Sequence, residues 1–171
     1  MNIISAIAAS MALGAADTQA EHVERALIVG GGEVSIGSKT YTSGLRATPE
    51  SNSFCSGALI SPIHVLTAAS CTGYRELGFV AVGTHCLNGT LDGEAIKVMG
   101  AKNHTLYNST SLSYDFAVLM LEKPSKFTPV KPPKADHSNI TPGMWSSALG
   151  WGISSYPNRT DAYELQSLWH F

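Results

Sequence analysis

The sequence has 171 residues, a formal net charge of -2, 44% hydrophobic residues and 14% charged residues. A chain of this length can form one compact domain, or one domain and part of a second. Because no basic patch or positive net charge is present, nucleic acids and anionic membrane surfaces are excluded as partners. The 16 glycines and 8 prolines favour an all-β fold of short strands joined by turns.

Residues 1–20 predict a signal peptide. The stretch from Ile3 to Ala16 is apolar or small, and the small residues Thr18 and Ala20 suit a cleavage site. A membrane anchor is the alternative, but the apolar run covers about 14 residues whereas a span needs roughly 20. We therefore expect a secreted, extracellular protein without membrane attachment, which begins with a polar leader at residues 21–27.

Five Asn-x-Ser/Thr sequons without a central proline agree with passage through the secretory route. In such a protein they accept glycans on surface loops, although individual sites often stay unused. The five asparagines are Asn88, Asn103, Asn108, Asn139 and Asn158.

Short apolar segments separated by turn residues predict eight strands. These are Lys39–Ala47, Phe54–Ile60, His64–Thr67, Leu77–Val82, Ala95–Ala101, Asp115–Leu121, Ser146–Trp151 and Glu164–Trp169. The run Phe116–Leu121 is apolar at every position, which predicts a strand buried on both faces.

Lys123 to Pro133 contains four prolines and three lysines and reads as an extended connector. We therefore predict a first unit over residues 28–122, a connector over 123–137 and a second, shorter unit over 138–171. No cofactor and no metal are expected.

Four patterns occur in one order along the chain: Ile28-Val29-Gly30-Gly31, Leu66–Cys71, Tyr114–Leu119 and Gly150-Trp151-Gly152. Together they resemble the amino terminus, the histidine box, the aspartate strand and an early second-barrel motif of the chymotrypsin-like serine proteases. The resemblance implies an antiparallel β-barrel fold. The first barrel is expected to be complete, and the second truncated.

The same resemblance implies a disulfide between Cys55 and Cys71, which closes the loop around the histidine box. A loop of about 17 residues closed in this way contributes roughly 3 kcal/mol. Cys86 is left over. A buried thiol, a reactive exposed thiol and an intermolecular bridge are its possible fates, and we take buried and inert as the default.

The catalytic positions that the family implies are degenerate. The base position, directly before the cysteine of the histidine box, holds Ser70, whose hydroxyl cannot accept a proton as imidazole does. Asp115 stands at the orienting carboxylate position, where it has no imidazole to orient. The family's Gly-Asp-Ser-Gly-Gly segment, which carries the nucleophile, is not found before Phe171. We therefore predict a homologue that is not a protease.

Two histidines are the candidates for a substitute base, and neither suits the role. His64 opens a predicted strand six residues before Ser70, and His104 lies beside a sequon, so both read as surface or satisfied side chains. The activation site is also altered, because Arg25 is followed by Ala26 and Leu27 rather than directly by Ile28.

Segments Ala68–Cys71, Lys102–Tyr107, Leu121–Phe127 and Pro142–Trp145 resemble the glucanase inhibitor proteins of oomycete plant pathogens. That resemblance implies a protein partner, the plant endo-β-1,3-glucanase. It also implies a role in the host apoplast, where inhibition suppresses the release of defence-eliciting glucan fragments. Two alternatives stay open: an inert truncated homologue, and a serine endopeptidase with displaced catalytic residues.

Overall fold

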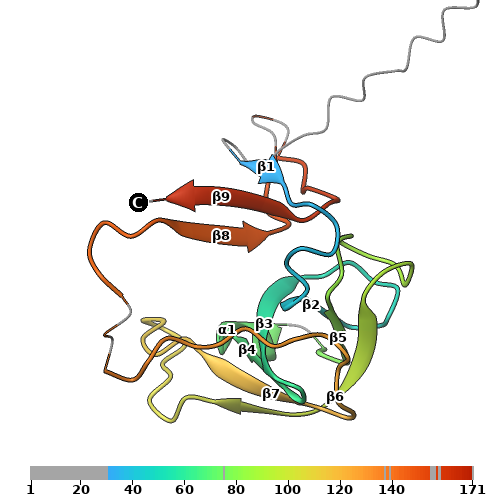
Figure 1. The fold of residues 1–171 in the computed structure, drawn as a ribbon. Helices are drawn as coiled ribbons and strands as arrows, with labels where there is room; N and C mark the ends of the chain where they lie inside the picture. The colour runs from blue at the N-terminus through green and yellow to red at the C-terminus, as the bar shows by residue number, and fades with distance from the viewer. Residues whose placement is uncertain are drawn as a thin grey trace, which may run out of the picture.

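The computed structural model describes residues 31–74, 76–136, 138, 140–154, 157 and 159–170, and shows an all-β protein (Figure 1). The predicted signal peptide and leader lie outside these residues. The elements are β1 (Gly32–Glu33), β2 (Thr42–Arg46), β3 (Cys55–Ser61), β4 (His64–Thr67), α1 (Ser70–Tyr74), β5 (Phe79–Val82), β6 (Glu94–Asn103), β7 (Ala117–Leu121), β8 (Ser146–Gly150) and β9 (Gln166–His170). All eight predicted strands are confirmed. The five-residue α1, the single helix in the described ranges, is far too short to cross a membrane.

Six strands close a barrel in the order β2-β3-β4-β7-β6-β5, and every pair in it is antiparallel. Alternate residues of each strand point inward, which produces a core of aliphatic side chains. Its most deeply buried members are Leu45, Leu59, Val65, Val80, Val82, Ile96 and Leu119. The predicted complete first barrel is therefore confirmed.

Strand β7 corrects one expectation. Ala117, Leu119 and Leu121 are buried, but Phe116 and Met120 are 45% and 47% exposed. The prediction that this strand is buried on both faces is wrong, because a closed barrel has only one inward face and little covers the outer face of β7.

A second, smaller sheet has the order β1-β9-β8 and lies beside the barrel in Figure 1. Its core consists of Val34, Leu87, Trp151 and Leu165. The predicted division of the chain placed residues 28–122 in the first barrel, but β1 lies in the other sheet. Gly32 and Glu33 pair with β9 instead, so this short segment completes the second sheet.

The predicted connector packs along the barrel. Between Leu121 and Ser146 the described residues form no strand, and Ser125 N and Val130 N donate to Pro62 O (2.8 Å) and Leu59 O (2.9 Å). The hydroxyl of Ser125 also donates to Glu94 Oε2 at 2.6 Å. The unit boundaries at 122, 137 and 171 stay a prediction.

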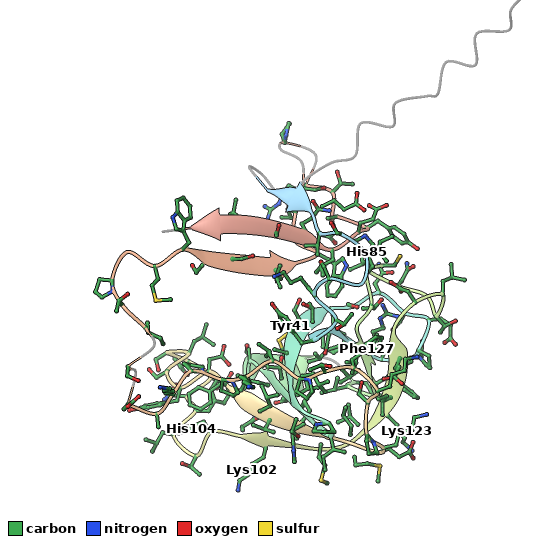
Figure 2. The ribbon with its side chains drawn as sticks, in the orientation of Figure 1. Tyr41, His85, Lys102, His104, Lys123 and Phe127 are labelled. Carbon is green, nitrogen blue, oxygen red and sulfur yellow. A yellow bond between two sulfur atoms is a disulfide. The ribbon has the colours of Figure 1, made fainter. Side chains whose placement is uncertain are left out.

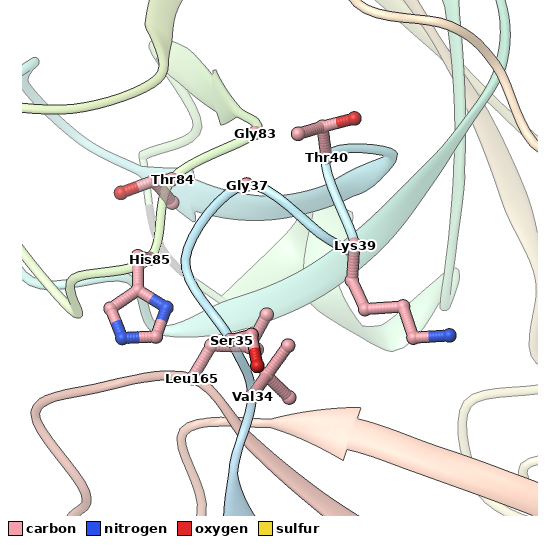
Figure 3. A pocket seen from close by; sticks show the side chains of 9 residues that line it. All are labelled: Val34, Ser35, Gly37, Lys39, Thr40, Gly83, Thr84, His85 and Leu165. Carbon is pink, nitrogen blue, oxygen red and sulfur yellow. The ribbon is translucent and has the colours of Figure 1, made fainter.

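The segment from Thr84 to Leu87 joins the barrel to the second sheet. His85 O accepts from Leu165 N (2.8 Å) and from Trp151 Nε1 (2.9 Å), while Leu87 N donates to Tyr163 O (2.7 Å). Figure 3 shows the small cavity at this junction, whose lining includes Val34, His85 and Leu165. Its volume of about 10 Å³ holds no more than a water molecule.

Candidate functional site

Ser70 and Asp115 meet because β4 and β7 are antiparallel neighbours. The pairing of Thr67 with Ala117 brings the end of β4 beside the start of β7, and the two residues lie just beyond these ends. Ser70 Oγ donates to Asp115 Oδ2 at 2.9 Å, and Ser70 N donates to Asp115 Oδ1 at 2.7 Å. Both carboxylate oxygens therefore bind the residue that begins α1.

The chain turns sharply into Asp115. Tyr114 has φ = 55° and Leu112 has φ = 53°, a left-handed conformation that costs a residue with a side chain about 1–2 kcal/mol. The ring of Tyr114 stacks on the ring of His104, with 4.9 Å between the ring centroids, and this contact holds Tyr114 in place. The strain is local to the turn that aims the carboxylate at Ser70.

The three histidines with described side chains all have partners away from this pair. His64 Nδ1 lies 2.7 Å from Ser61 Oγ, and His85 Nε2 lies 3.1 Å from Glu33 Oε1. His104 stacks on Tyr114 and contacts Phe116 at a tilt of 48°, and its Nδ1 accepts from Leu106 N at 3.2 Å. His64 and His104 are thus satisfied where they stand, in line with the sequence interpretation.

Cys55 and Cys71 form a disulfide with an S–S distance of 1.95 Å and a Cα–Cα distance of 6.1 Å. The bond ties the start of β3 to the first turn of α1. It thereby fixes the helix whose first residue contacts Asp115. The position next to Asp115 holds the hydroxyl of Ser70, and both the hydroxyl and the backbone N–H of this residue donate to the carboxylate.

The family model described as Trypsin matches residues 28–168, the part of the chain that contains the barrel, the disulfide and Asp115. The chain belongs to the trypsin family. A solved structure described as "Structure of GrC" shares the fold, with a TM-score of 0.69 and 27% identity over 82% of this chain and 63% of that chain.

Curated relatives are similar over nearly the whole of this trypsin-family chain. Glucanase inhibitor protein 3 of Phytophthora sojae (strain P6497) is 60% identical over 98% of the chain and 66% of its own length. Glucanase inhibitor proteins 1 and 2 of Phytophthora infestans are 62% and 59% identical over 94% and 98% of the chain, and 62% and 65% of their own lengths. The chain therefore spans just under two thirds of the relatives it matches.

One feature of this trypsin-family chain escaped the sequence interpretation. Arg46 is fully buried in β2, and its guanidinium donates to Ser53 Oγ, Pro49 O, Gly89 O, Thr84 Oγ1 and Cys86 O. Burial lowers the pKa of Arg46, and Asp92 opposes that shift. An arginine near the end of the predicted strand Lys39–Ala47 was the available signal.

Cys86 is half-buried, which corrects the expectation of a buried thiol. His85 and Leu87 are buried and point inward. Cys86 lies between them in an extended segment, so its side chain faces outward, beside Glu164. Burial raises the pKa of the Cys86 thiol, the nearby Asp92 carboxylate raises it further, and a hydrogen bond with Tyr163 opposes both. The thiol is therefore partly accessible but mostly protonated at neutral pH.

The described sequon asparagines differ in their contacts. Asn103 and Asn108 are exposed; Asn103 Oδ1 accepts from Thr72 Oγ1, and Asn108 Oδ1 accepts from Thr110 N and Ser111 N. Asn88 is half-buried, and its Nδ2 donates to Asn52 Oδ1 at 2.7 Å. Asn139 and Asn158 lie outside the described residues.

Proposed function

We propose that this chain is a secreted, proteolytically inactive member of the trypsin family that binds and inhibits host plant endo-β-1,3-glucanase. The observation that carries the proposal is the 59–62% identity to three proteins named glucanase inhibitors, over 94–98% of this chain. Inhibition in the host apoplast suppresses the release of defence-eliciting glucan fragments.

The contact between Ser70 and Asp115 supports the absence of proteolysis. Serine catalysis needs a base that takes the proton of the nucleophile, and a carboxylate that orients this base. Here the base position holds a hydroxyl that itself donates to Asp115 at 2.9 Å. The carboxylate is therefore engaged in a structural bond, and the protein acts by contact.

A rigid closed barrel is well suited to inhibition by contact. Loops that project from such a scaffold keep their positions, so little conformational freedom is lost on binding. A specific protein interface needs about 800 Å² from each partner, which an exposed face of one barrel can supply.

The proposal is tested by titrating the purified secreted chain into a plant endo-β-1,3-glucanase that hydrolyses laminarin. We expect hydrolysis to fall in proportion to complex formation, and the glucanase to stay intact on a denaturing gel. The core variant Leu45→Asp, which cannot fold, is the matched negative control. If the folded chain neither co-precipitates the glucanase nor slows hydrolysis at micromolar concentration, the inert-homologue alternative replaces this function.

Secretion and glycosylation form part of the same proposal. Asn103 and Asn108 are exposed, so we expect both to carry glycans, whereas the half-buried amide of Asn88 is engaged with Asn52. Peptide mapping after enzymatic deglycosylation in heavy-oxygen water measures the glycan occupancy of each asparagine, which should be higher at Asn103 and Asn108 than at Asn88. Occupancy at Asn88 that equals or exceeds that at Asn108 would contradict it.

A further inference from the structure

An exposed sequon lies on the barrel face that carries Ser70 and Asp115. Asn103 is the last residue of β6, and its Oδ1 accepts from Thr72 Oγ1 at 2.9 Å. Thr72 belongs to α1, two residues after Ser70. This first sequon therefore stands beside the short helix whose first residue donates to Asp115.

A second exposed sequon adjoins the other member of that contact. Asn108 forms an isolated antiparallel bridge with Ser113, which is two residues before Asp115. Asn108 Oδ1 accepts from Thr110 N at 2.9 Å and from Ser111 N at 3.0 Å, which closes a turn. The two asparagines are thus placed near the same polar contact, one close to each of its members.

The positions of both sequons are set by the barrel. Their contacts all fall between β4 and β7, which are neighbouring strands of the barrel, or in the loops that join barrel strands. Figure 2 shows His104, the middle residue of the first sequon, far from His85, where the barrel joins the second sheet. The geometry of this face therefore does not depend on the second sheet.

Both asparagines present the atom that glycosylation modifies. Among the described residues, Nδ2 of Asn103 and Nδ2 of Asn108 have no hydrogen-bond partner, while both Oδ1 atoms are engaged. Transfer of a glycan forms a bond from Nδ2 to the first sugar, breaks the bond of that sugar to the diphosphate of a lipid-linked donor, and releases one proton from Nδ2. The Oδ1 contacts survive this reaction and hold both side chains in their present directions.

Leu106 reports on the surface between the two sequons. It lies between Asn103 and Asn108 in the sequence and is 59% exposed. Single exposed leucines are common on protein surfaces, so Leu106 does not by itself mark a contact site. Bulky glycans on its two sides, however, reduce its accessibility. The accessibility of Leu106 therefore measures how far glycans cover this face.

We propose that N-glycans on Asn103 and Asn108 cover the barrel face that carries Ser70 and Asp115, so that the protein partner binds on a different face. A specific interface needs close contact over about 800 Å² of each partner, and two bulky glycans on one face prevent such contact there. The position of the partner rests on the proposed function, whereas the glycan cover rests on the two sequons and their contacts.

Oxidation by hydroxyl radicals, detected by mass spectrometry, tests the glycan cover without the glucanase. The variant Thr105→Ala/Thr110→Ala removes both sequons at exposed threonines and keeps both asparagines with their Oδ1 contacts. We expect oxidation of Leu106 to rise about 2-fold in this variant, because oxidation follows the exposed area. Ile36, a residue 77% exposed between β1 and β2, is the control and should not change.

Enzymatic deglycosylation of the native chain gives the same comparison without substitutions, and so keeps the test valid if the variant is not secreted. Unmodified Asn103 and Asn108 in the secreted chain would overturn the inference. Equal oxidation of Leu106 with and without glycans would overturn it as well.

The variant Leu106→Asp tests where the partner binds. We expect its Kd for the glucanase to stay within about 2-fold of the native value, in glycosylated and in deglycosylated chain, because a residue outside an interface contributes little to affinity. A Kd raised about 10-fold or more, equal to about 1.4 kcal/mol, places the partner on this face and overturns the inference. Protection of Leu106 from oxidation by the glucanase, in deglycosylated chain, has the same meaning. If the glucanase does not bind the native chain at all, the proposed function fails, and the oxidation of Leu106 still decides the glycan cover.

Discussion

At the scale of single residues, the contacts of Asp115 with Ser70 indicate a structural role for this carboxylate. Asp115 accepts from both the backbone and the side chain of Ser70, and so satisfies an N–H at the start of α1. In a protease the same carboxylate orients a base. Here it stabilises the fold, and two substitutions separate these roles.

The variant Asp115→Ala leaves Ser70 N and Oγ without their acceptor in a partly buried site. We expect the free energy of unfolding to fall by about 1–3 kcal/mol, measured by urea denaturation. Inhibition of the glucanase by the folded variant should be unchanged. Glu122→Ala, at an exposed carboxylate, serves as the control with a change below about 0.5 kcal/mol. Lost inhibition in a well-folded Asp115→Ala chain would place Asp115 in the interface.

The variant Ser70→His restores an imidazole beside Asp115. No protease activity is expected, because these 171 residues contain no Gly-Asp-Ser-Gly-Gly segment to supply a nucleophile and oxyanion donors. The measurement is labelling by a fluorophosphonate probe, with trypsin as the positive control. Stoichiometric labelling of the variant would show that another serine is activated.

The Cys86 thiol should titrate at a higher pH in the folded chain than its ordinary value of 9.0, because burial and Asp92 disfavour the thiolate. Since the folded pKa is the higher one, the thiol stabilises the folded state below about pH 9 and loses this contribution as pH rises through the folded pKa. The rate of alkylation by iodoacetamide against pH, in folded and urea-unfolded chain, measures the shift. Coincident midpoints would contradict it, and Cys86→Ser gives the background.

At the scale of elements, short apolar segments bounded by turn residues were enough to predict the eight longer strands, because each strand of the barrel is only a few residues long and ends at a turn. The two missed elements are the five-residue α1 and the two-residue β1, which are too short to show a period. Strand β1 exists only through its pairing with β9. Long-range pairing of that kind leaves no local signal.

The site was predicted in part for the same reason. The positions of Ser70 and Asp115 follow from motifs, and without an imidazole the carboxylate is an acceptor available to Ser70. The geometry of their two hydrogen bonds depends on how β4 and β7 pair. The burial of Arg46 depends on contacts between residues far apart in the sequence, such as those with Cys86 O and Gly89 O. No periodic pattern encodes such contacts.

Arg46 connects strand β2 to the loop between β5 and β6. Gly93 in that loop has φ = 71°, and a Cβ there would lie 2.7 Å from Val82 O, so the loop approaches the barrel closely. Arg46→Met removes the donors for the carbonyl groups of Pro49, Cys86 and Gly89. Because each buried acceptor left unpaired costs about 1–3 kcal/mol, we expect a loss of about 3–5 kcal/mol in unfolding free energy.

Urea denaturation measures the Arg46→Met effect, and Lys102→Met is its control because Lys102 is exposed on the barrel surface. A change below about 1 kcal/mol in Arg46→Met would show that the loop keeps its position without the guanidinium.

At the scale of the whole molecule, two cores of unequal size meet at the Thr84–Leu87 segment. The barrel core has nine buried members and the second core has four. Trp151 belongs to the smaller core, and its Nε1 also donates to His85 O. The second sheet therefore depends on this side chain more than the barrel does.

Trp151→Ala should remove about 3–5 kcal/mol of packing from the second sheet while the barrel remains folded. Hydrogen exchange should then accelerate at β8 and β9 but stay slow at β4 and β7. Trp145→Ala, the same change at a residue 64% exposed, is the matched control. Uniform acceleration in all strands would mean that the two cores unfold as one unit.

The pairing of β1 with β9 also sets an order of folding. Every barrel strand lies between Thr42 and Leu121, but Gly32 of β1 pairs with Ser167 of β9, which is 135 positions later in the chain. Closing so long a loop is slow and entropically costly compared with forming neighbouring hairpins. During synthesis the barrel can thus form first, and the second sheet is completed only when β9 has left the ribosome.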